Sequence, residues 1–393
     1  MRIIGFVVKI TIFLFVFHLL SCLNNNLVNP DNLKVNNIET ENYIDPLKER
    51  AAEIVSLMDE RLLAAQVLIS GVDGRETLPL NSIDLLTEIP AGGIMLFRYN
   101  LSVNNSTIRS FLAEISILIS EKSGIKPFMA VDHEGGSVNR FSRDITTLPA
   151  AVSYWDIFLE EGRETALEKI KNDSFKSAQD INILGINMNF APVAEYLIDE
   201  NRVFMASRSY GPDPLFTFQA ALAFIQGMER AGIICVVKHF PGSAGTDPHY
   251  SASVLNWDKP ALDKLVSPFS LLINNGARAI MAAHTLTPVI DSKIASLSSV
   301  VMKDWLRDEL GFDGIIISDD FIMAAAGSQK PEDAAVSSIA AGSDMILVWP
   351  AHLRTTHQAI LNALQDGTLS RERLADAVQR IVYEKLKMGL IEF

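Results

Sequence analysis

The stretch Gly232-Ile233-Ile234-Cys235-Val236-Val237 runs directly into Lys238-His239-Phe240-Pro241-Gly242, and Thr246-Asp247-Pro248-His249 follows a few residues later. The apolar first part begins at a glycine and predicts a buried strand over residues 232–238. The polar residues after it must line a pocket or find partners, because burying them unpaired is costly. This arrangement fits the mouth of an α/β barrel, where the loops after the strands carry the chemistry.

The rest of the chain repeats this alternation of apolar runs and amphipathic segments. Strands are predicted over residues 66–70, 92–97, 127–131, 186–190, 232–238, 277–283, 314–318 and 344–348. Helices are predicted over residues 46–58, 106–122, 165–184, 215–231, 261–274, 299–310, 332–341 and within 352–387. Four predicted helices are followed by a glycine of the kind that caps a C-terminus, namely Gly185, Gly232, Gly276 and Gly342. The pattern predicts a single (β/α)8 TIM barrel over residues 46–393.

Composition excludes some classes of protein. The 393 residues are 48% hydrophobic and 21% charged, which is typical of a globular protein with a sizeable core. The formal net charge of −13 argues against a nucleic-acid partner, because phosphate binding needs clustered Lys and Arg. We expect a monomer.

The N-terminus predicts export. Met1-Arg2 and Lys9 precede an apolar run over residues 10–20, which is too short to span a bilayer but suits the core of a signal peptide. The ending Leu19-Leu20-Ser21-Cys22 resembles a bacterial lipoprotein signal, which implies a signal peptide over 1–21 and a lipid on Cys22. The Asn-rich residues 23–45 predict a flexible tether. An uncleaved membrane anchor is the alternative, and both interpretations place the protein outside the cytoplasm as a membrane-anchored protein.

Ionisable residues concentrate where the predicted strands end. In a barrel these positions share one rim, so their side chains are expected to meet there. They are Asp132, His133, Glu134 and Arg140 after the third strand, Glu195 and Arg208 after the fourth, Lys238, His239, Asp247 and His249 around the end of the fifth, His284 after the sixth, and Asp319 and Asp320 after the seventh. Such a concentration predicts an active site.

Asp319 and the pair Asp247 and His249 are the candidates for covalent and proton-transfer chemistry. Asp319 ends an apolar strand, so its carboxylate should project into the mouth and can attack an electrophilic carbon or bind a cation. Asp320 should point the opposite way and suits a helix N-cap. Asp247 and His249 lie on one side of an extended segment, where the carboxylate can orient the imidazole as a proton donor.

A metal site is a further possibility at the segment from Asp132 to Glu134, since barrel hydrolases can bind zinc through His and carboxylates. The sequence has no HxH or HExxH spacing, and we expect neither a metal nor another cofactor.

From about residue 55 onward the chain resembles the family-3 glycoside hydrolases, in particular the single-domain bacterial β-N-acetylhexosaminidases. The matching motifs are Gly92-Gly93-Ile94-Met95-Leu96-Phe97, Val131-Asp132-His133-Glu134-Gly135-Gly136, Ala191-Pro192-Val193, Arg208-Ser209-Tyr210-Gly211, Lys238-His239-Phe240-Pro241-Gly242 and Ser318-Asp319-Asp320. The resemblance implies a retaining mechanism with Asp319 as nucleophile and His249, oriented by Asp247, as acid/base. It also implies that the sugar is bound by Asp132, Arg140, Arg208, Lys238 and His239.

This chain departs from the family pattern in the loop after Gly242, which is about one residue shorter and carries Pro248 between Asp247 and His249. The hypothesis is an exported exo-β-N-acetylglucosaminidase acting on peptidoglycan fragments or chitooligosaccharides. A β-glucosidase, a phosphorylase and a non-catalytic sugar-binding surface lipoprotein are the alternatives.

Overall fold

Eight parallel strands form the wall of a barrel in the computed structural model, which describes residues 45–141, 144–245, 247–323, 327 and 329–391. Almost every strand residue is buried, as expected of parallel strands that are covered on both faces. In chain order the strands are β1 (Leu68–Gly71), β2 (Gly93–Leu96), β3 (Phe128–Val131), β4 (Met188–Asn189), β5 (Ile234–Phe240), β7 (Ala279–Ala282), β9 (Ile315–Ser318) and β10 (Ile346–Val348).

The sheet is nearly closed on itself. Its order is β10-β1-β2-β3-β4-β5-β7-β9, and each neighbouring pair is parallel. A parallel bridge between Ile317 and Met345 joins the two ends of this order. The predicted (β/α)8 TIM-barrel fold is confirmed, with all eight predicted strands present.

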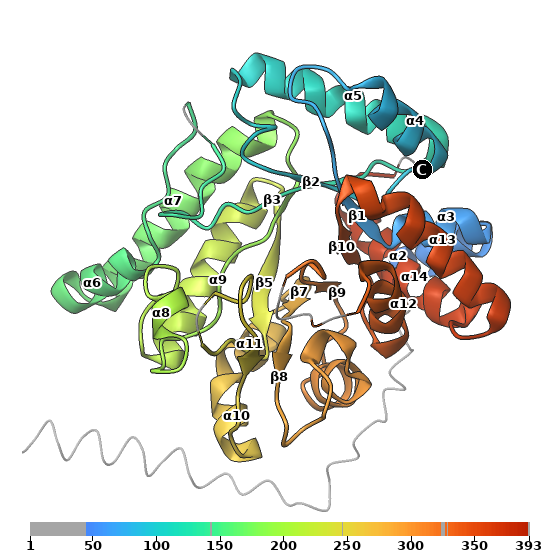
Figure 1. Ribbon diagram of the computed structural model, residues 1–393. Helices are drawn as coiled ribbons and strands as arrows, with labels where there is room; N and C mark the ends of the chain where they lie inside the picture. The colour runs from blue at the N-terminus through green and yellow to red at the C-terminus, as the bar shows by residue number, and fades with distance from the viewer. Residues whose placement is uncertain (1–44, 142–143, 246, 324–326, 328, 392–393) are drawn as a thin grey trace, which may run out of the picture. The chain divides into compact units, whose positions relative to one another are not determined.

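Helices surround the barrel (Figure 1). They are α2 (Pro46–Ser56), α3 (Glu60–Gln66), α4 (Leu80–Glu88), α5 (Asn105–Ser123), α6 (Val152–Glu161), α7 (Arg163–Ile183), α8 (Arg202–Met205), α9 (Pro214–Arg230), α10 (Lys259–Leu265), α11 (Ser267–Asn274), α12 (Pro331–Ala341), α13 (Pro350–Asp366), α14 (Arg371–Lys387), a 3-10 helix η2 (Ala295–Leu297) and a π-helix η3 (Val300–Glu309). Several begin at a residue whose side chain accepts a hydrogen bond from the first turn, namely Asp59, Asn104, Asp213, Asp258 and Ser370.

Close packing of helices fixes their positions on the barrel. A Cβ atom on Gly227 of α9 would lie 1.9 Å from the Ser174 hydroxyl of α7, so glycine allows these two helices to approach each other. The four glycines predicted as caps have positive φ angles of 103°, 82°, 84° and 135°, which confirms why glycine follows those helices: Gly185, Gly232, Gly276 and Gly342.

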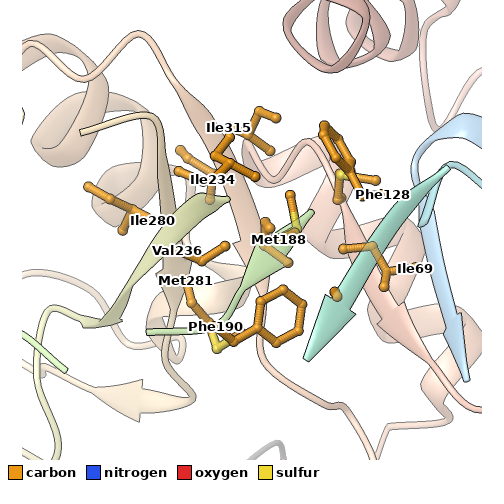
Figure 2. Close-up of a cluster of buried hydrophobic side chains, with 14 of the residues drawn as sticks. Ile69, Phe128, Met188, Phe190, Ile234, Val236, Ile280, Met281 and Ile315 are labelled. Atoms are coloured by element: carbon orange, nitrogen blue, oxygen red, sulfur yellow. The ribbon is translucent and has the colours of Figure 1, made fainter. Parts of the chain in front are cut away.

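Apolar side chains fill the barrel below its mouth. Figure 2 shows Phe128, Met188, Ile234 and Ile315 gathered in one cluster, with Phe190 and Met281 below them in that view. Side chains alternate along each strand, so residues two positions further along point the same way. This alternation carries Asp132, Lys238 and Asp319 to the same side as Ala130, Val236 and Ile317, beyond the ends of the apolar layers.

Several local predictions were wrong. The helix predicted over 261–274 is two helices that are separated at Val266 (φ −83°, ψ 1°). A continuous helix is disfavoured because Pro268, in the first turn of α11, has no N–H to donate to the Lys264 carbonyl and its ring would clash with it. The segment predicted as an ordinary helix over 299–310 is the π-helix η3. Strand β5 runs two residues beyond the predicted end at Lys238. A small parallel ribbon of β6 (Ser253–Val254) and β8 (Thr285–Leu286) was not predicted.

The chain divides at Asp45, and residues 46–393 form one unit. The predicted signal peptide, Cys22 and all of the tether except Asp45 lie outside the described residues. None of the described helices has the length and apolar character needed to cross a membrane.

Candidate active site

A cavity of about 310 Å³ opens at the carboxyl ends of the barrel strands. Its lining includes every barrel residue to which the family resemblance gives a role except Asp247, which contacts the cavity-lining His249. The residues brought together here are Asp132, Arg140, Arg208, Lys238, His239, His249 and Asp319. They come from sequence positions 132 to 319, so the barrel topology alone makes them neighbours.

Asp132 and Lys238 form the centre of a buried ion-pair cluster. The Lys238 Nζ atom donates to Asp132 Oδ1 at 2.8 Å and lies 2.7 Å from Glu134 Oε1. Arg140 donates to the second oxygen of Asp132 at 3.1 Å. Burial alone would lower the pKa of Lys238, but the two carboxylates outweigh it and raise that pKa above its ordinary value. Lys238 is therefore a fixed positive charge at the mouth of the barrel.

Glu134 and Arg208 complete this cluster. Arg208 donates from Nε and from a terminal nitrogen to the two oxygens of Glu134, at 2.8 Å and 2.7 Å. Such bidentate pairs fix both distance and orientation. Burial would raise the pKa of Glu134, but Arg208 and Lys238 hold it well below the ordinary range. We call Asp132, Glu134, Arg140, Arg208 and Lys238 the ion-pair cluster.

His239 is held by Glu195. The His239 Nδ1 atom lies 2.6 Å from Glu195 Oε1, and the other carboxylate oxygen accepts from the Ser243 backbone N–H at 2.6 Å. Lys238 and His239 are consecutive, yet both line the cavity. The pairing of β5 with β7 shifts register between Val237 and Phe240, and such an irregularity redirects a side chain.

Asp247 and His249 stand on the loop after β5, which we call the β5 loop (residues 241–252). Asp247 Oδ1 accepts from the backbone N–H of His249 at 2.9 Å and lies 2.6 Å from its Nδ1 atom. The side chain of His249 is 59% exposed and that of Asp247 is 37% exposed. Partial burial would raise the pKa of Asp247, but these contacts with His249 lower it. The carboxylate thus fixes the ring with Nε2 left for another partner.

Both ends of the β5 loop are tied down. The Ser253 hydroxyl accepts from the Ala244 N–H at 2.9 Å and lies 2.9 Å from the Thr285 hydroxyl of the β6–β8 ribbon. The Gly245 N–H donates to the Glu200 carbonyl at 2.7 Å. Asp247 and His249 lie along the chain between these anchors.

Asp319 lies at the end of β9 and lines the cavity, as predicted. Its Oδ1 atom accepts from the Asp320 N–H at 2.8 Å. The prediction that Asp320 caps a helix was wrong: its carboxylate accepts from the Ile322 N–H and from the Trp349 indole, and the next described helix begins at Pro331. Asp320 instead closes a turn and fixes the rim beside Asp319.

The other histidines of the rim, His133 and His284, are buried, and each is hydrogen-bonded through at least one ring nitrogen. His133 Nε2 lies 2.9 Å from the Ser177 hydroxyl, and burial lowers the pKa of His133 to about 4. His284 contacts the Ser296 hydroxyl at 2.7 Å and the Asp320 carbonyl at 2.9 Å, and burial lowers its pKa as well. In the part of the chain that the structure describes, no group of three His, Cys, Asp or Glu side chains is arranged to hold a metal ion.

Two carboxylates of the site were placed on the rim by the sequence but given no role. Glu134 follows Asp132 by two residues, so extended backbone carries both to the same side. That signal could have identified Glu134. The pairing of Glu195 with His239 spans 44 residues and leaves no local signal.

Comparison with known proteins agrees with this geometry. Residues 75–383 match the family model for the N-terminal domain of glycosyl hydrolase family 3. A β-hexosaminidase of Neisseria gonorrhoeae is 36% identical over 262 residues, which cover 65% of this chain and 71% of that protein. A β-hexosaminidase of Methylococcus capsulatus is 34% identical over 297 residues, which cover 73% of this chain and 83% of that protein.

Solved structures give the same relationship. The crystal structure of NagZ from N. gonorrhoeae in complex with N-trifluoroacetyl-D-glucosamine matches with a TM-score of 0.68 and 28% identity, over 80% of this chain and 89% of that chain. A family 3 β-N-acetylglucosaminidase from Paenibacillus sp. matches with a TM-score of 0.79 and 28% identity over 86% of this chain, which spans 64% of that longer protein. This chain belongs to glycosyl hydrolase family 3 and is a glycoside hydrolase.

Proposed function

We propose that this protein is a retaining exo-β-N-acetylglucosaminidase that removes terminal β-linked N-acetylglucosamine from peptidoglycan fragments or chitooligosaccharides. One observation carries the proposal: Asp319, His249 and the ion-pair cluster line the same cavity at the barrel mouth. A nucleophilic carboxylate, an oriented imidazole and charged partners for a sugar are the groups that this reaction needs. The β-hexosaminidase relatives and the NagZ complex support the sugar specificity.

In the proposed first step, a carboxylate oxygen of Asp319 bonds to the anomeric carbon while the glycosidic bond breaks. Protonated His249 donates its proton to the departing oxygen. In the second step, neutral His249 takes a proton from water, whose oxygen bonds to the anomeric carbon and releases Asp319. Asp247 keeps the His249 ring oriented throughout, and the exposed position of His249 gives it access to both the leaving group and water.

In this proposal Asp132, Arg140, Arg208, Lys238 and His239 hold the terminal sugar. Their side chains are fixed by one another and by Glu134 and Glu195 before any sugar arrives, so little rotational freedom is lost on binding. We further propose, from the sequence of residues 1–22, that the enzyme is an exported lipoprotein anchored through Cys22. We also propose that it acts as a monomer and without a metal.

The test is hydrolysis of 4-nitrophenyl β-N-acetylglucosaminide by the wild-type enzyme and by Asp319→Ala. The proposal expects wild-type turnover and a loss on the order of 10⁴-fold or more in kcat for the variant, with the fold retained. A variant with a wild-type rate would contradict Asp319 as nucleophile. Trapping with a 5-fluoro-N-acetylglucosaminyl fluoride, which keeps the 2-acetamido group, should add one sugar to Asp319 and none to the variant.

The same assay separates the alternatives. Faster turnover of the 4-nitrophenyl glucoside than of the N-acetylglucosaminide would make the protein a β-glucosidase. A rate that depends on added phosphate, with a sugar phosphate as product, would make it a phosphorylase. Sugar binding without turnover of either substrate would make it a binding protein.

A further inference from the structure

Two aromatic rings stack on the barrel rim next to the cavity. Phe97 follows β2 and Trp349 follows β10, and their ring centroids lie 4.8 Å apart with an interplanar angle of 12°. Trp349 is 40% exposed although tryptophan is among the largest apolar side chains. We call this pair the rim platform. An indole that is stacked on one face and open to solvent is a surface for a ligand with a flat apolar face.

The rim platform is continuous with the active-site cavity. Leu347 of β10 lines the cavity, and Trp349 follows it by two residues in extended backbone, with φ −80° and ψ 153°. Side chains two apart in extended backbone point to the same side, so Trp349 lies above Leu347 toward the mouth. The Trp349 Nε1 atom also donates to Asp320 Oδ2 at 2.6 Å, which holds the indole beside the residue that follows Asp319.

The packing beneath the rim platform holds it in place. A Cβ atom on Gly71 would lie 3.0 Å from Pro350 Cδ and 3.2 Å from Phe97 Cε2. Glycine at the end of β1 therefore makes room for the Phe97 ring and for the ring of Pro350, the residue after Trp349. The Phe97 backbone N–H donates to the side chain of buried Asn100 at 2.9 Å, and Asn100 donates in turn to the carbonyls of Val72 and Gly74. A surface fixed in this way loses little freedom when a ligand binds.

We propose that the face of Trp349 is a stacking site for the sugar ring on the leaving-group side of the scissile bond. The inference rests on the proposed function of the adjacent cavity, which holds the terminal sugar by charged groups. A β-linked pyranose presents its axial C–H groups on a flat apolar face, which matches an exposed indole. The natural substrate is then a glycan of at least two rings, and Trp349 selects it over glycosides whose leaving group has no ring.

The test compares two substrates in variants of Trp349. Chitotriose has a sugar ring on the leaving side, whereas methyl β-N-acetylglucosaminide has none. Trp349→Leu should lower kcat/KM for chitotriose roughly ten- to hundredfold, the range of an aromatic anchor in a binding site, and leave the methyl glycoside within about twofold. Trp349→Phe, which keeps a flat ring but loses the N–H donor, should recover most of the loss. Equal losses on the two substrates, or no loss on chitotriose, would overturn the inference.

A binding measurement separates failure of this inference from failure of the proposed function. In Asp319→Ala, whose turnover should be too slow to disturb the measurement, chitotriose should bind at least about ten times more tightly than N-acetylglucosamine, and adding Trp349→Leu should remove this advantage. If the wild type hydrolyses neither substrate but this advantage is present and lost with Trp349, the stacking site stands and the enzyme proposal fails. If the wild type hydrolyses chitotriose and Trp349→Leu changes neither rate nor binding, the enzyme proposal stands and the stacking site fails.

Discussion

The ion-pair cluster and the β5 loop face the same cavity but are built in opposite ways. Lys238 and Glu134 are 3% and 5% exposed in their side chains, and each has two charged partners. His249 and Asp247 are 59% and 37% exposed and are bonded to each other. In the proposed mechanism the first group fixes a sugar in one pose, whereas the second must reach a leaving group and then a water. The difference between the two regions matches the difference between binding and proton transfer.

The largest expected effect on stability and turnover comes from a substitution in the ion-pair cluster. Lys238→Met leaves partly buried Asp132 and buried Glu134 without their shared cation, each with one arginine partner remaining. Removing one partner of a buried ion pair costs about 3–5 kcal/mol, so the free energy of unfolding should fall by up to that amount. Turnover should fall at least about 10³-fold, because the groups that orient the sugar move apart. Chemical denaturation and hydrolysis of 4-nitrophenyl β-N-acetylglucosaminide measure the two effects.

Lys385→Met is the matched control. Lys385 of α14 is also fully buried, but its Nζ atom donates to the neutral Gln66 side chain at 2.9 Å, and burial lowers its pKa to about 7. Replacing it should leave turnover unchanged and stability equal or higher, because a poorly compensated buried amine is removed. Equal destabilisation by both substitutions would mean that the ion pairs around Lys238 add nothing beyond packing.

A substitution in the β5 loop should lower turnover but leave stability unchanged. His249→Ala removes the proposed proton donor and should lower kcat by about 10²–10⁴-fold, the range typical of general acid/base groups. Its melting temperature should stay within about 2 °C of wild type, because the side chain is mostly in solvent. A large loss of stability, or a rate close to wild type, would contradict the division between the two regions.

The barrel itself could be predicted because each strand is a continuous apolar run and glycines mark several helix ends. Because the ends of the strands of a barrel share one rim, the sequence likewise placed Asp132, Lys238 and Asp319 together at the mouth of the barrel. The pairings among the rim residues could not be predicted, since Arg208 and Glu134, although both were placed on the rim, are 74 residues apart and meet only in the folded barrel. Trp349 stands at a strand end too, but a search for ionisable groups passes over an indole. Its exposure and its bond to Asp320 become visible only in the structure.

Acid should destabilise the fold through buried His133, which is next to the ion-pair cluster in the sequence. Burial lowers the pKa of His133, the residue after Asp132, from 6.5 to about 4. As pH falls from about 6.5 toward 4, the unfolded chain binds a proton at this histidine that the folded protein excludes. The free energy of unfolding should therefore fall with decreasing pH in this window, by up to about 1.4 kcal/mol per pH unit from this group.

Buried His284 and His357 have lowered pKa values and act in the same direction, so the variant His133→Gln isolates the contribution of His133. Denaturation measured at several pH values should show a shallower pH dependence in the variant than in wild type. Parallel curves would mean that His133 titrates alike in the folded and unfolded states.

The smallest expected effect is that of Asp247→Asn, and it sharpens the comparison most. The amide oxygen can still accept the His249 backbone N–H, so the turn should persist while the negative charge is lost. An exposed ion pair is worth up to about 1 kcal/mol, which corresponds to roughly a fivefold loss in kcat with KM and stability unchanged. The loss should be smaller with a 2,4-dinitrophenyl leaving group, which departs without a proton. A loss on the order of 10⁴-fold, as for a buried carboxylate that orients a catalytic histidine, would contradict an exposed pair. It would mean that the β5 loop closes over the cavity during turnover and buries Asp247 with the substrate.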